Sequence, residues 1–334
     1  MRKIDETYDQ LEKALYGVEN VVTYFVRETV RSTWFTQVPV KLNLDTASPS
    51  FGNTFNATVS RAGDYLLNAW LRVTLDASTD QAGSGNTVAW TPNLMHNLVQ
   101  RCKLTFNDMT AAEFYSEHLD FWTAFMIPAS KRAGYNRMIG NFSGYASGAS
   151  SQGTHGPFGG VRSTTASSLN DAVDLYLPLP FFFSRDSGVS LPTAALPYNE
   201  IKMEFTFRNA ADLIYEVTTG SAIAAGTITT TPALSNVQVW GNYAIVSNEE
   251  RKMMGCNPRD MVIEQNQQIG GSYGSGKLNV NSWNETTSVE LRLKHSVKAM
   301  FFGAKNQMGL TESPFRANYN TSTLSASDIM AVKI

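Results

Sequence analysis

The sequence predicts an all-β protein built from antiparallel sandwiches, and three observations support this fold class. Short segments rich in β-branched and aromatic residues recur from about residue 21 onward, separated by Pro, Gly, Asn and Asp. Residues 198–208 alternate between polar and apolar side chains, and the apolar face consists of Ile201, Met203, Phe205 and Phe207. The 334 residues suffice for two ordinary domains of about 100 to 200 residues each. We therefore expect two successive β-sandwiches.

The composition disfavours nucleic acid as a partner. The chain has 27 Lys and Arg against 29 Asp and Glu, so its formal charge is only -2 and it lacks the basic field that attracts phosphate backbones. Charged residues make up 17%, below the roughly 25% of average soluble domains, while aromatic residues reach 11%. This profile is typical of strands, loops and surfaces that contact other protein.

Neither the cysteines nor the apolar segments indicate secretion. Cys102 and Cys256 lie too far apart for a metal-binding pair, so we expect two buried free thiols in a reducing compartment. Residues 1–17 are charged and lack the apolar core of a secretory signal. No apolar run approaches the roughly 20 residues that cross a bilayer. The sequence therefore predicts a soluble protein that is not secreted.

Residues 1–20 are predicted to form an N-terminal helical arm. Their apolar stripe has helical spacing, Gly17 follows as a stop, and the stripe consists of Ile4, Tyr8, Leu11 and Leu15. The stripe has no partner within the arm. It could dock on its own domain or on a neighbouring subunit.

Residues 21–246 are predicted to form the first sandwich. Residues 98–106 alternate with one slip, which indicates a strand with a bulge. Prolines 178, 180, 192 and 197 lack a backbone donor and are expected at strand ends, bulges or edges. The predicted strands cover residues 22–27, 34–38, 55–61, 65–75, 98–106, 173–183, 189–195, 198–208 and 237–246.

A helical insert, residues 111–140, interrupts these strands. A helix is expected over residues 111–126 from the spacing of Phe114, Leu119, Trp122 and Met126, with Pro128 ending it. A second short helix is expected over 129–139. Residues 141–172 are rich in Gly, Ser and Thr, and we expect them to form a long surface loop.

Residues 247–258 are predicted to link the first sandwich to a second. Ser247 followed three residues later by Glu250 is a capping box, and Gly255 is the expected helix stop. Residues 259–334 then begin a second run of strands, predicted over 261–265, 288–295 and 297–304.

Two groups of residues are candidates for chemical sites. His118 lies near Glu113, Glu117 and Asp120, with Cys102 upstream, but the spacing matches no metal-binding pattern, so a solvated helix face is favoured. The adjacent Arg185 and Asp186 are interpreted as a structural ion pair at a loop corner rather than as catalytic groups.

The glycine-rich segments also carry no recognisable chemistry. Residues 83–85 and 270–276 lack the Lys and Ser/Thr of a phosphate-binding loop, and no G-x-S-x-G nucleophile motif is present. We therefore assign no catalytic, cofactor-binding or metal-ligating residue, and we expect no enzyme activity, cofactor or small-molecule substrate.

Several co-linear segments carry a family resemblance. Residues 175–201, LYLPLPFFFSRDSGVSLPTAALPYNEI, closely resemble the major capsid proteins of iridoviruses and, more loosely, those of other large nucleocytoplasmic DNA viruses. The similarity is greatest to members that infect invertebrates. It continues through residues 23–40, 60–73, 93–108, 118–141 and 239–256, and so spans nearly the whole chain.

The resemblance implies a double jelly roll, with two sandwiches side by side. It also implies homotrimers that form pseudo-hexagonal capsomers of an icosahedral capsid over an internal lipid membrane. The expected partners are further copies of the chain and minor capsid proteins, and the expected location is the virion, assembled in the host cytoplasm. The arm would lie at the capsomer base and loop 141–172 on the surface.

One departure concerns the second jelly roll. Family members are longer, and the roughly 80 residues after Gly255 cannot supply eight strands of about 5 to 6 residues with their connections. We expect a partial sequence whose second jelly roll is incomplete. A carbohydrate-binding jelly roll is the alternative function, because lectins share this architecture.

Overall fold

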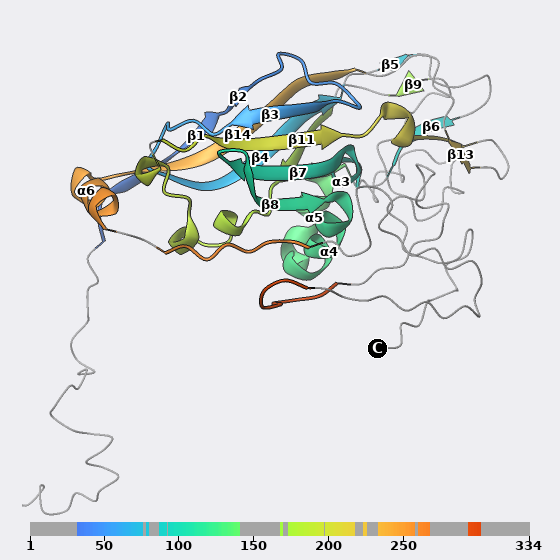
Figure 1. The fold of residues 1–334 in the computed structure, drawn as a ribbon. Helices are drawn as coiled ribbons and strands as arrows, with labels where there is room; N and C mark the ends of the chain where they lie inside the picture. Colours follow the sequence, from blue (N-terminus) through green and yellow to red (C-terminus); the bar gives the residue numbers. More distant parts are fainter. Residues whose placement is uncertain are drawn as a thin grey trace, which may run out of the picture. The chain divides into compact units, whose positions relative to one another are not determined.

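The computed structural model describes eleven stretches of the chain (Figure 1): residues 32–75, 78–79, 87–91, 93–140, 168–169, 173–196, 198–217, 223–225, 233–257, 260–267 and 293–301. The chain divides into two compact units, Met1–Trp34 and Phe35–Ile334, and all elements below belong to the second. The predicted arm, 1–20, and the predicted strand 22–27 lie outside the described residues.

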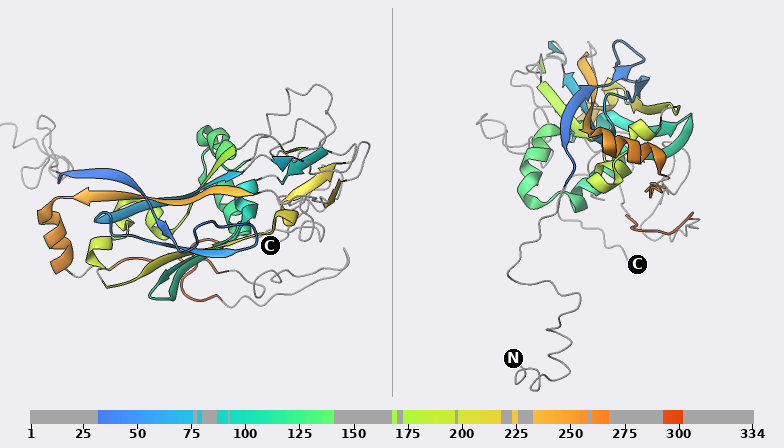
Figure 2. Two further views of the ribbon diagram at one scale, coloured as in Figure 1. Left: turned by 90° about the horizontal axis from the view of Figure 1, so that it is seen from above. Right: turned by 90° about the vertical axis from the view of Figure 1, so that its left-hand side faces the viewer.

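Two antiparallel sheets form the body of this unit (Figures 1 and 2). Sheet A has four strands, in the order β1 (Phe35–Lys41), β14 (Leu234–Val246), β4 (Tyr65–Leu75) and β10 (Val173–Pro178). Sheet B has five, in the order β2 (Asn43–Leu44), β3 (Thr54–Thr58), β11 (Ile201–Phe207), β7 (Val99–Phe106) and β8 (Met109–Tyr115).

The strand order is that of a jelly roll. With the short β2 set aside, the chain passes from one sheet to the other at every step, β1, β3, β4, β7, then β8, β10, β11 and β14. The β7–β8 hairpin is the exception, since both strands lie in sheet B. Eight strands in two Greek keys across two sheets define a jelly roll, so the sandwich predicted for this part of the chain is confirmed.

Smaller elements lie beside the two sheets. One small sheet joins β13 (Ile223–Ala225), β12 (Ile214–Val217) and β6 (Thr87–Trp90), and a two-stranded ladder joins β5 (Ser78–Thr79) to β9 (Ser168–Leu169). Since β9 falls within the predicted loop 141–172, the end of that loop is paired. The remainder of the loop lies outside the described residues.

Alternating side chains fill the core between the sheets. In β11 the predicted alternation is confirmed, because Ile201, Met203, Phe205 and Phe207 are all buried. The Phe55 ring stacks on Phe205 with centroids 5.3 Å apart and meets Phe207 edge-on at 4.9 Å. Such aromatic pairs contribute about 0.5 to 1.5 kcal/mol beyond area burial.

The predicted bulge in residues 98–106 is confirmed. Arg101 lies opposite Thr206 and Val99 opposite Phe207, so Gln100 is the extra residue. It lets Val99 and Cys102 both face the core, where burial raises the pKa of the Cys102 thiol well above its ordinary value. The strand begins at Val99, because Leu94–Leu98 form the short helix α3.

The predicted helix 111–126 is wrong in its first part. Residues Met109–Tyr115 are strand β8, and helices α4 (Ser116–Met126) and α5 (Ala129–Met138) follow on either side of Pro128. Asn107 and Asp108 have φ of 46° and 65°, the left-handed values of a tight hairpin turn, and they fold β8 back onto β7. The ladder with β7 therefore overrides the local apolar spacing.

Residues 189–195 are also not the predicted strand. They contain parts of two 3-10 turns, η3 (Ser187–Val189) and η4 (Thr193–Ala195), with a single bridge from Leu191 to Leu66 between them. Pro192 lacks the N–H that a longer ladder would need. The preceding predicted strand likewise ends at Pro178, before η2 (Phe182–Ser184), and η5 (Ala210–Asp212) follows β11.

Helix α6 (Asn248–Cys256) occupies the predicted linker. The Ser247 hydroxyl accepts a hydrogen bond from the Glu250 N–H at 3.4 Å, so the predicted N-cap is confirmed. Gly255 lies inside the helix instead of stopping it, because the helix continues to Cys256. Cys256 is exposed, which corrects the prediction that both thiols are buried.

The predicted strands after the linker have no counterpart in the described residues. Residues 260–267 and 293–301 contain no strand, although 261–265 and 297–301 have the pattern of one. A strand needs a neighbouring backbone to complete its ladder, and β-propensity alone does not supply it. The second jelly roll stays a prediction for this chain. In the described part of the chain, no helix is long and apolar enough to cross a membrane.

Two glycines give opposite tests of this packing. A Cβ at Gly241, in the centre of β14, would lie 2.8 Å from Leu66 Cδ1 and 3.1 Å from Tyr243 Cε2. We expect Gly241→Ala to lower the free energy of unfolding by about 1 to 3 kcal/mol through overpacking. A Cβ at Gly134 in α5 would contact nothing, so Gly134→Ala should raise the free energy of unfolding by about 0.8 to 1 kcal/mol. Urea unfolding of both variants tests the packing, and equal effects would contradict it.

Candidate functional site

The structure separates the residues weighed as a metal cluster. Glu113 pairs with Arg101 at 3.2 Å, and Asp120 pairs with His96 at 2.7 Å. The His118 ring lies against Phe114, with centroids 6.4 Å apart, and burial lowers its pKa. His118 is therefore half-buried against Phe114 and only partly solvated. Among the described residues, no three His, Cys, Asp or Glu side chains gather as metal ligands.

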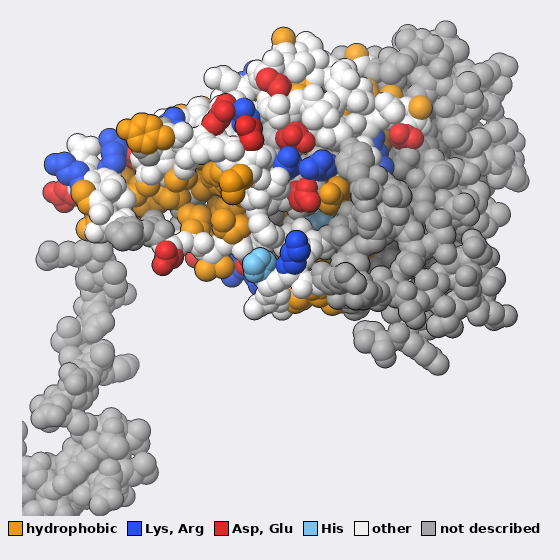
Figure 3. Space-filling model, viewed as in Figure 1, with side chains coloured by type: hydrophobic (Ala, Val, Ile, Leu, Met, Phe, Trp, Pro, Cys, Tyr) orange, Lys and Arg blue, Asp and Glu red, His pale blue; other side chains and the backbone are white. Residues whose placement is uncertain are grey.

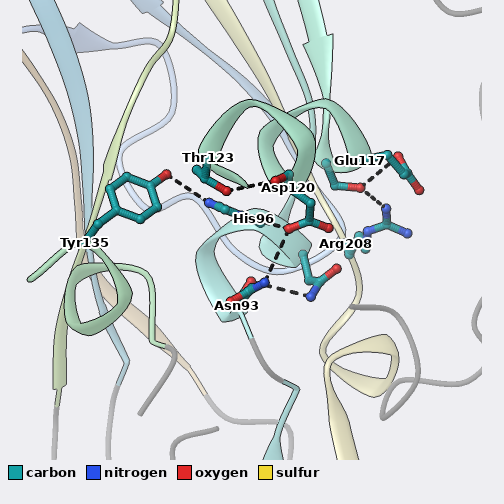
Figure 4. A network of polar contacts seen from close by, with 9 residues as sticks. Asn93, His96, Glu117, Asp120, Thr123, Tyr135 and Arg208 are labelled. Atoms are coloured by element: carbon teal, nitrogen blue, oxygen red, sulfur yellow. Dashed lines mark hydrogen bonds and ion pairs between the residues drawn. The ribbon is translucent and has the colours of Figure 1, made fainter. Parts of the chain in front are cut away.

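A buried polar network joins the three helices α3, α4 and α5 (Figure 4). His96 on α3 places Nδ1 at 2.7 Å from Asp120 Oδ1 and Nε2 at 2.9 Å from the Tyr135 hydroxyl. A neutral imidazole satisfies both contacts, with Nδ1–H donating to the carboxylate and Nε2 accepting from the hydroxyl. Asn93 Nδ2 donates to the same carboxylate oxygen at 3.4 Å, and the Thr123 hydroxyl donates to the Asp120 backbone oxygen at 2.9 Å.

A second chain of hydrogen bonds links this region to sheet B. The Arg208 guanidinium donates to Ser116 Oγ at 2.6 Å, and the Ser116 hydroxyl donates to Glu117 Oε2 at 3.1 Å. Ser116 is the first residue of α4, and Arg208 directly follows β11. The contact therefore fixes the start of α4 against the sheet.

The order carboxylate, imidazole, hydroxyl resembles a proton relay, but its surroundings favour a structural role. The His96 side chain is 0% exposed and the Asp120 side chain 8%. Burial and the Asp120 charge raise the pKa of Tyr135, which makes its hydroxyl a poor nucleophile at neutral pH. The arrangement therefore holds three helices together. Sequence reasoning missed it because the partners of His96 lie 24 and 39 positions away.

Hydrogen bonds to Asp64 hold helix α6 against the jelly roll. Its carboxylate accepts two hydrogen bonds from Arg251, from Nε at 2.7 Å and Nη2 at 2.9 Å, and one from the Val246 N–H at 2.9 Å. The hydrogen bonds from Arg251 outweigh the cost of burial and lower the pKa of Asp64. The start of β4, the end of β14 and α6 thus meet at one carboxylate. This junction sets where the chain leaves the jelly roll.

The segment after α6 lies beside the η2–η3 region and α4. Glu264 pairs with Arg185, and Lys298 lies 2.6 Å from the same carboxylate oxygen. The expected Arg185–Asp186 pair is therefore wrong, because Arg185 turns to a residue 79 positions away. Gln265 Nε2 donates to the Ala111 carbonyl of the edge strand β8 at 3.0 Å. The Phe301 ring stacks on Phe121, with centroids 6.0 Å apart.

Large apolar side chains are exposed at several places in the described structure, and Figure 3 shows apolar side chains gathered on one face. They are typical of surfaces that other protein covers. On the jelly roll and α6 they are Phe35, Val38, Met109, Phe125, Met126, Tyr198 and Met253. In the segments after α6 they are Val262, Ile263, Val297, Met300 and Phe301.

The family model for the N-terminus of the major capsid protein matches residues 23–246, which include all eight jelly-roll strands. The chain belongs to the major capsid protein family. This confirms the resemblance of its segments to iridovirus capsid proteins.

Major capsid proteins of several viruses are similar to this chain. Those of Tipula iridescent virus and Simulium iridescent virus are each 46% identical over 330 residues, and that of Lymphocystis disease virus 1 is 40% identical over 326. Each match covers 95% of this chain but only 65 to 66% of the relative. The chain thus spans slightly less than two thirds of their length.

Solved capsid structures share the fold. The chain matches the capsid of PBCV-1 with a TM-score of 0.53 at 20% identity, over 76% of this chain and 54% of that one. It matches the Faustovirus major capsid protein with a TM-score of 0.52 at 11% identity, over 75% and 61%. These neighbours are double jelly-roll proteins, so the predicted fold class is confirmed, while the extent of the second jelly roll in this chain stays a prediction. These findings give no support to the carbohydrate-binding alternative.

The junction at Asp64 predicts a pH-dependent loss of stability. We expect Asp64→Asn to lower the free energy of unfolding by about 2 kcal/mol at pH 7, because a carboxylate that accepts charged hydrogen bonds is lost. The folded-state pKa is depressed, so this contribution is complete above the unfolded-state value of about 3.9 and disappears as the pH falls through the lower folded-state value. Urea unfolding from pH 7 to 2 measures it. The exposed Asp186→Asn is the control, and a difference that persists unchanged to pH 2 would contradict the prediction.

The helix network predicts a second effect. Tyr135→Phe leaves His96 Nε2 buried without its partner, so we expect it to cost about 1 to 3 kcal/mol in the free energy of unfolding. Tyr198→Phe is the matched control, since Tyr198 is 96% exposed and should change by less than about 0.5 kcal/mol. Thermal unfolding by circular dichroism compares the two. Equal transitions would show that the network is not stabilising.

Proposed function

We propose that this chain provides the first jelly roll, and the beginning of the second, of a structural major capsid protein. Homotrimers of that protein would form pseudo-hexagonal capsomers that tile the icosahedral capsid of a large DNA virus. The observation that carries the proposal is the family match over residues 23–246, within which the jelly-roll strand order is complete.

The architecture supports this use. Two sandwiches per chain would give six per trimer, and a six-fold unit packs in a hexagonal array. Helix α6 and the segment after it leave the jelly roll at a position fixed by Asp64 and Arg251, which suits a second sandwich placed beside the first. The exposed apolar side chains offer contacts for such neighbours.

The partners and location follow from the same proposal. The chain would contact further copies of itself and minor capsid proteins, and the capsid would lie over an internal lipid membrane. Assembly would take place in the host cytoplasm, with the finished protein in the virion. The arm 1–20 would lie at the capsomer base and loop 141–172 on the surface. The role is structural, without catalysis, cofactor or nucleic-acid binding.

Self-association of the purified chain tests this function. We expect light scattering coupled to size exclusion to show oligomers whose mass is a multiple of three chains, increasing with protein concentration. Electron microscopy of the same fractions should show flat hexagonal arrays or shells. A chain that stays monomeric up to the highest soluble concentration, while circular dichroism shows it folded, would overturn the proposal.

A further inference from the structure

The outer face of sheet A carries two tryptophan side chains in one row across its strands. Trp240 of β14 lies directly opposite Trp70 of β4, and the row continues to Lys41 of β1 and Pro178 of β10. Opposed residues of neighbouring strands point to the same face of a sheet. The residues before and after them, such as Leu71 and Val239, are 0% exposed in the core, so this row faces outward.

The two indoles form a preordered pair. Their ring centroids lie 6.4 Å apart and their planes differ by only 5°. Trp240 Nε1 donates to Gln238 Oε1 at 3.0 Å, so the polar atom of that ring is satisfied within the face itself. Both side chains are partly exposed, and their geometry is fixed before any partner arrives.

Arg72 and Asp174, beside the indoles, are already paired with each other, and Lys41 is exposed at the β1 edge of the row. Arg72 Nη2 lies 2.8 Å from Asp174 Oδ2, and Thr74 donates to the other oxygen of the same carboxylate. The Arg72 guanidinium carbon also lies 5.9 Å from the centre of the Tyr176 ring. If another surface covers this face, Arg72 and Asp174 therefore keep each other as partners. Burying an ion without a partner is the main cost of covering charged groups.

The outer face of sheet B has a different composition. There Glu204, Lys103 and Glu113 occupy one row across β11, β7 and β8, and Lys202 and Arg101 flank it. A dense alternation of exposed charges is typical of a surface that stays in water. The same jelly roll thus presents one charged face and one with few charges and several aromatic residues.

We propose that the outer face of sheet A, centred on Trp70 and Trp240, is a contact surface for a second copy of this chain. The inference rests on the proposed capsid function, because a shell built from copies of one chain repeats this face on every subunit and offers it to neighbouring copies. Trp, Tyr and Arg are the residues that dominate binding energy at protein interfaces. Pro39 lies in the edge strand β1, and proline hinders strand addition there, so the contact is made by the face.

The size of the face sets the expected effect. Four strands about 4.8 Å apart and about seven residues long at 3.3 Å each cover roughly 400 Å². A standard interface buries about 800 Å² on each partner, so this face provides about half of one. Disrupting it should weaken association strongly without abolishing every contact between copies.

Charge insertion at Asn68 tests the surface with little risk to folding. Asn68 is exposed on β4 and shares the outward row with Asn242 and Pro39, next to the tryptophan row. We expect Asn68→Arg and Asn68→Glu each to raise the dissociation constant of the oligomer at least tenfold, since either charge must be desolvated. Thr54→Arg inserts the same charge on the outer face of sheet B and should change it less than twofold.

Sedimentation velocity of the full 334-residue chain measures these constants, and circular dichroism confirms that each variant is folded. If the unsubstituted chain associates and the Asn68 variants associate equally well, the proposed surface is wrong while the capsid function stands. If Thr54→Arg weakens association as much as Asn68→Arg, the face is not specific and the inference also fails. A monomeric unsubstituted chain would overturn the capsid function and this surface together.

Discussion

The jelly roll depends on one strand insertion. β14, the last of its eight strands, enters sheet A between β1 and β4, the first and third, instead of adding to an edge. Its ladder with β1 joins residues far apart in the chain, and Asn242 also donates a side-chain hydrogen bond to Gln37, 205 positions earlier. Because such contacts are non-local, they cost loop-closure entropy before they stabilise the fold. The Asp64 junction, helix α6 and half of the tryptophan pair all depend on this insertion.

Three ion pairs of the described structure connect separate elements of the fold. Asp64 and Arg251 tie the linker helix to the sandwich, His96 and Asp120 tie α3 to α4, and Glu264 ties the segment after α6 to Arg185. Each pair joins two elements that are separate in the sequence. A small number of charged residues can therefore fix the relative positions of many elements. These pairs therefore hold the surrounding elements in a fixed arrangement.

The features that could be predicted are those that show in the sequence of a single strand. β4 has the predicted bounds, and the alternation of β11 and the bulge at Gln100 are visible in the sequence because the period of two is a local property. The strand at residues 111–115 could not be predicted, because their apolar spacing fits a helix as well as a strand and pairing with β7 decides between them. The His96 network and the Arg185–Glu264 pair could not be predicted, because tertiary structure brings their members together.

The position of β14 also governs when the tryptophan face exists. Trp70 is made early and Trp240 more than two thirds of the way along the chain, so a growing polypeptide carries only one of the two indoles until its last jelly-roll strand emerges. Until then β1 and β4 lack the neighbour that separates them, and the outer surface of sheet A has not formed. The topology thus makes this face a property of the completed first sandwich only.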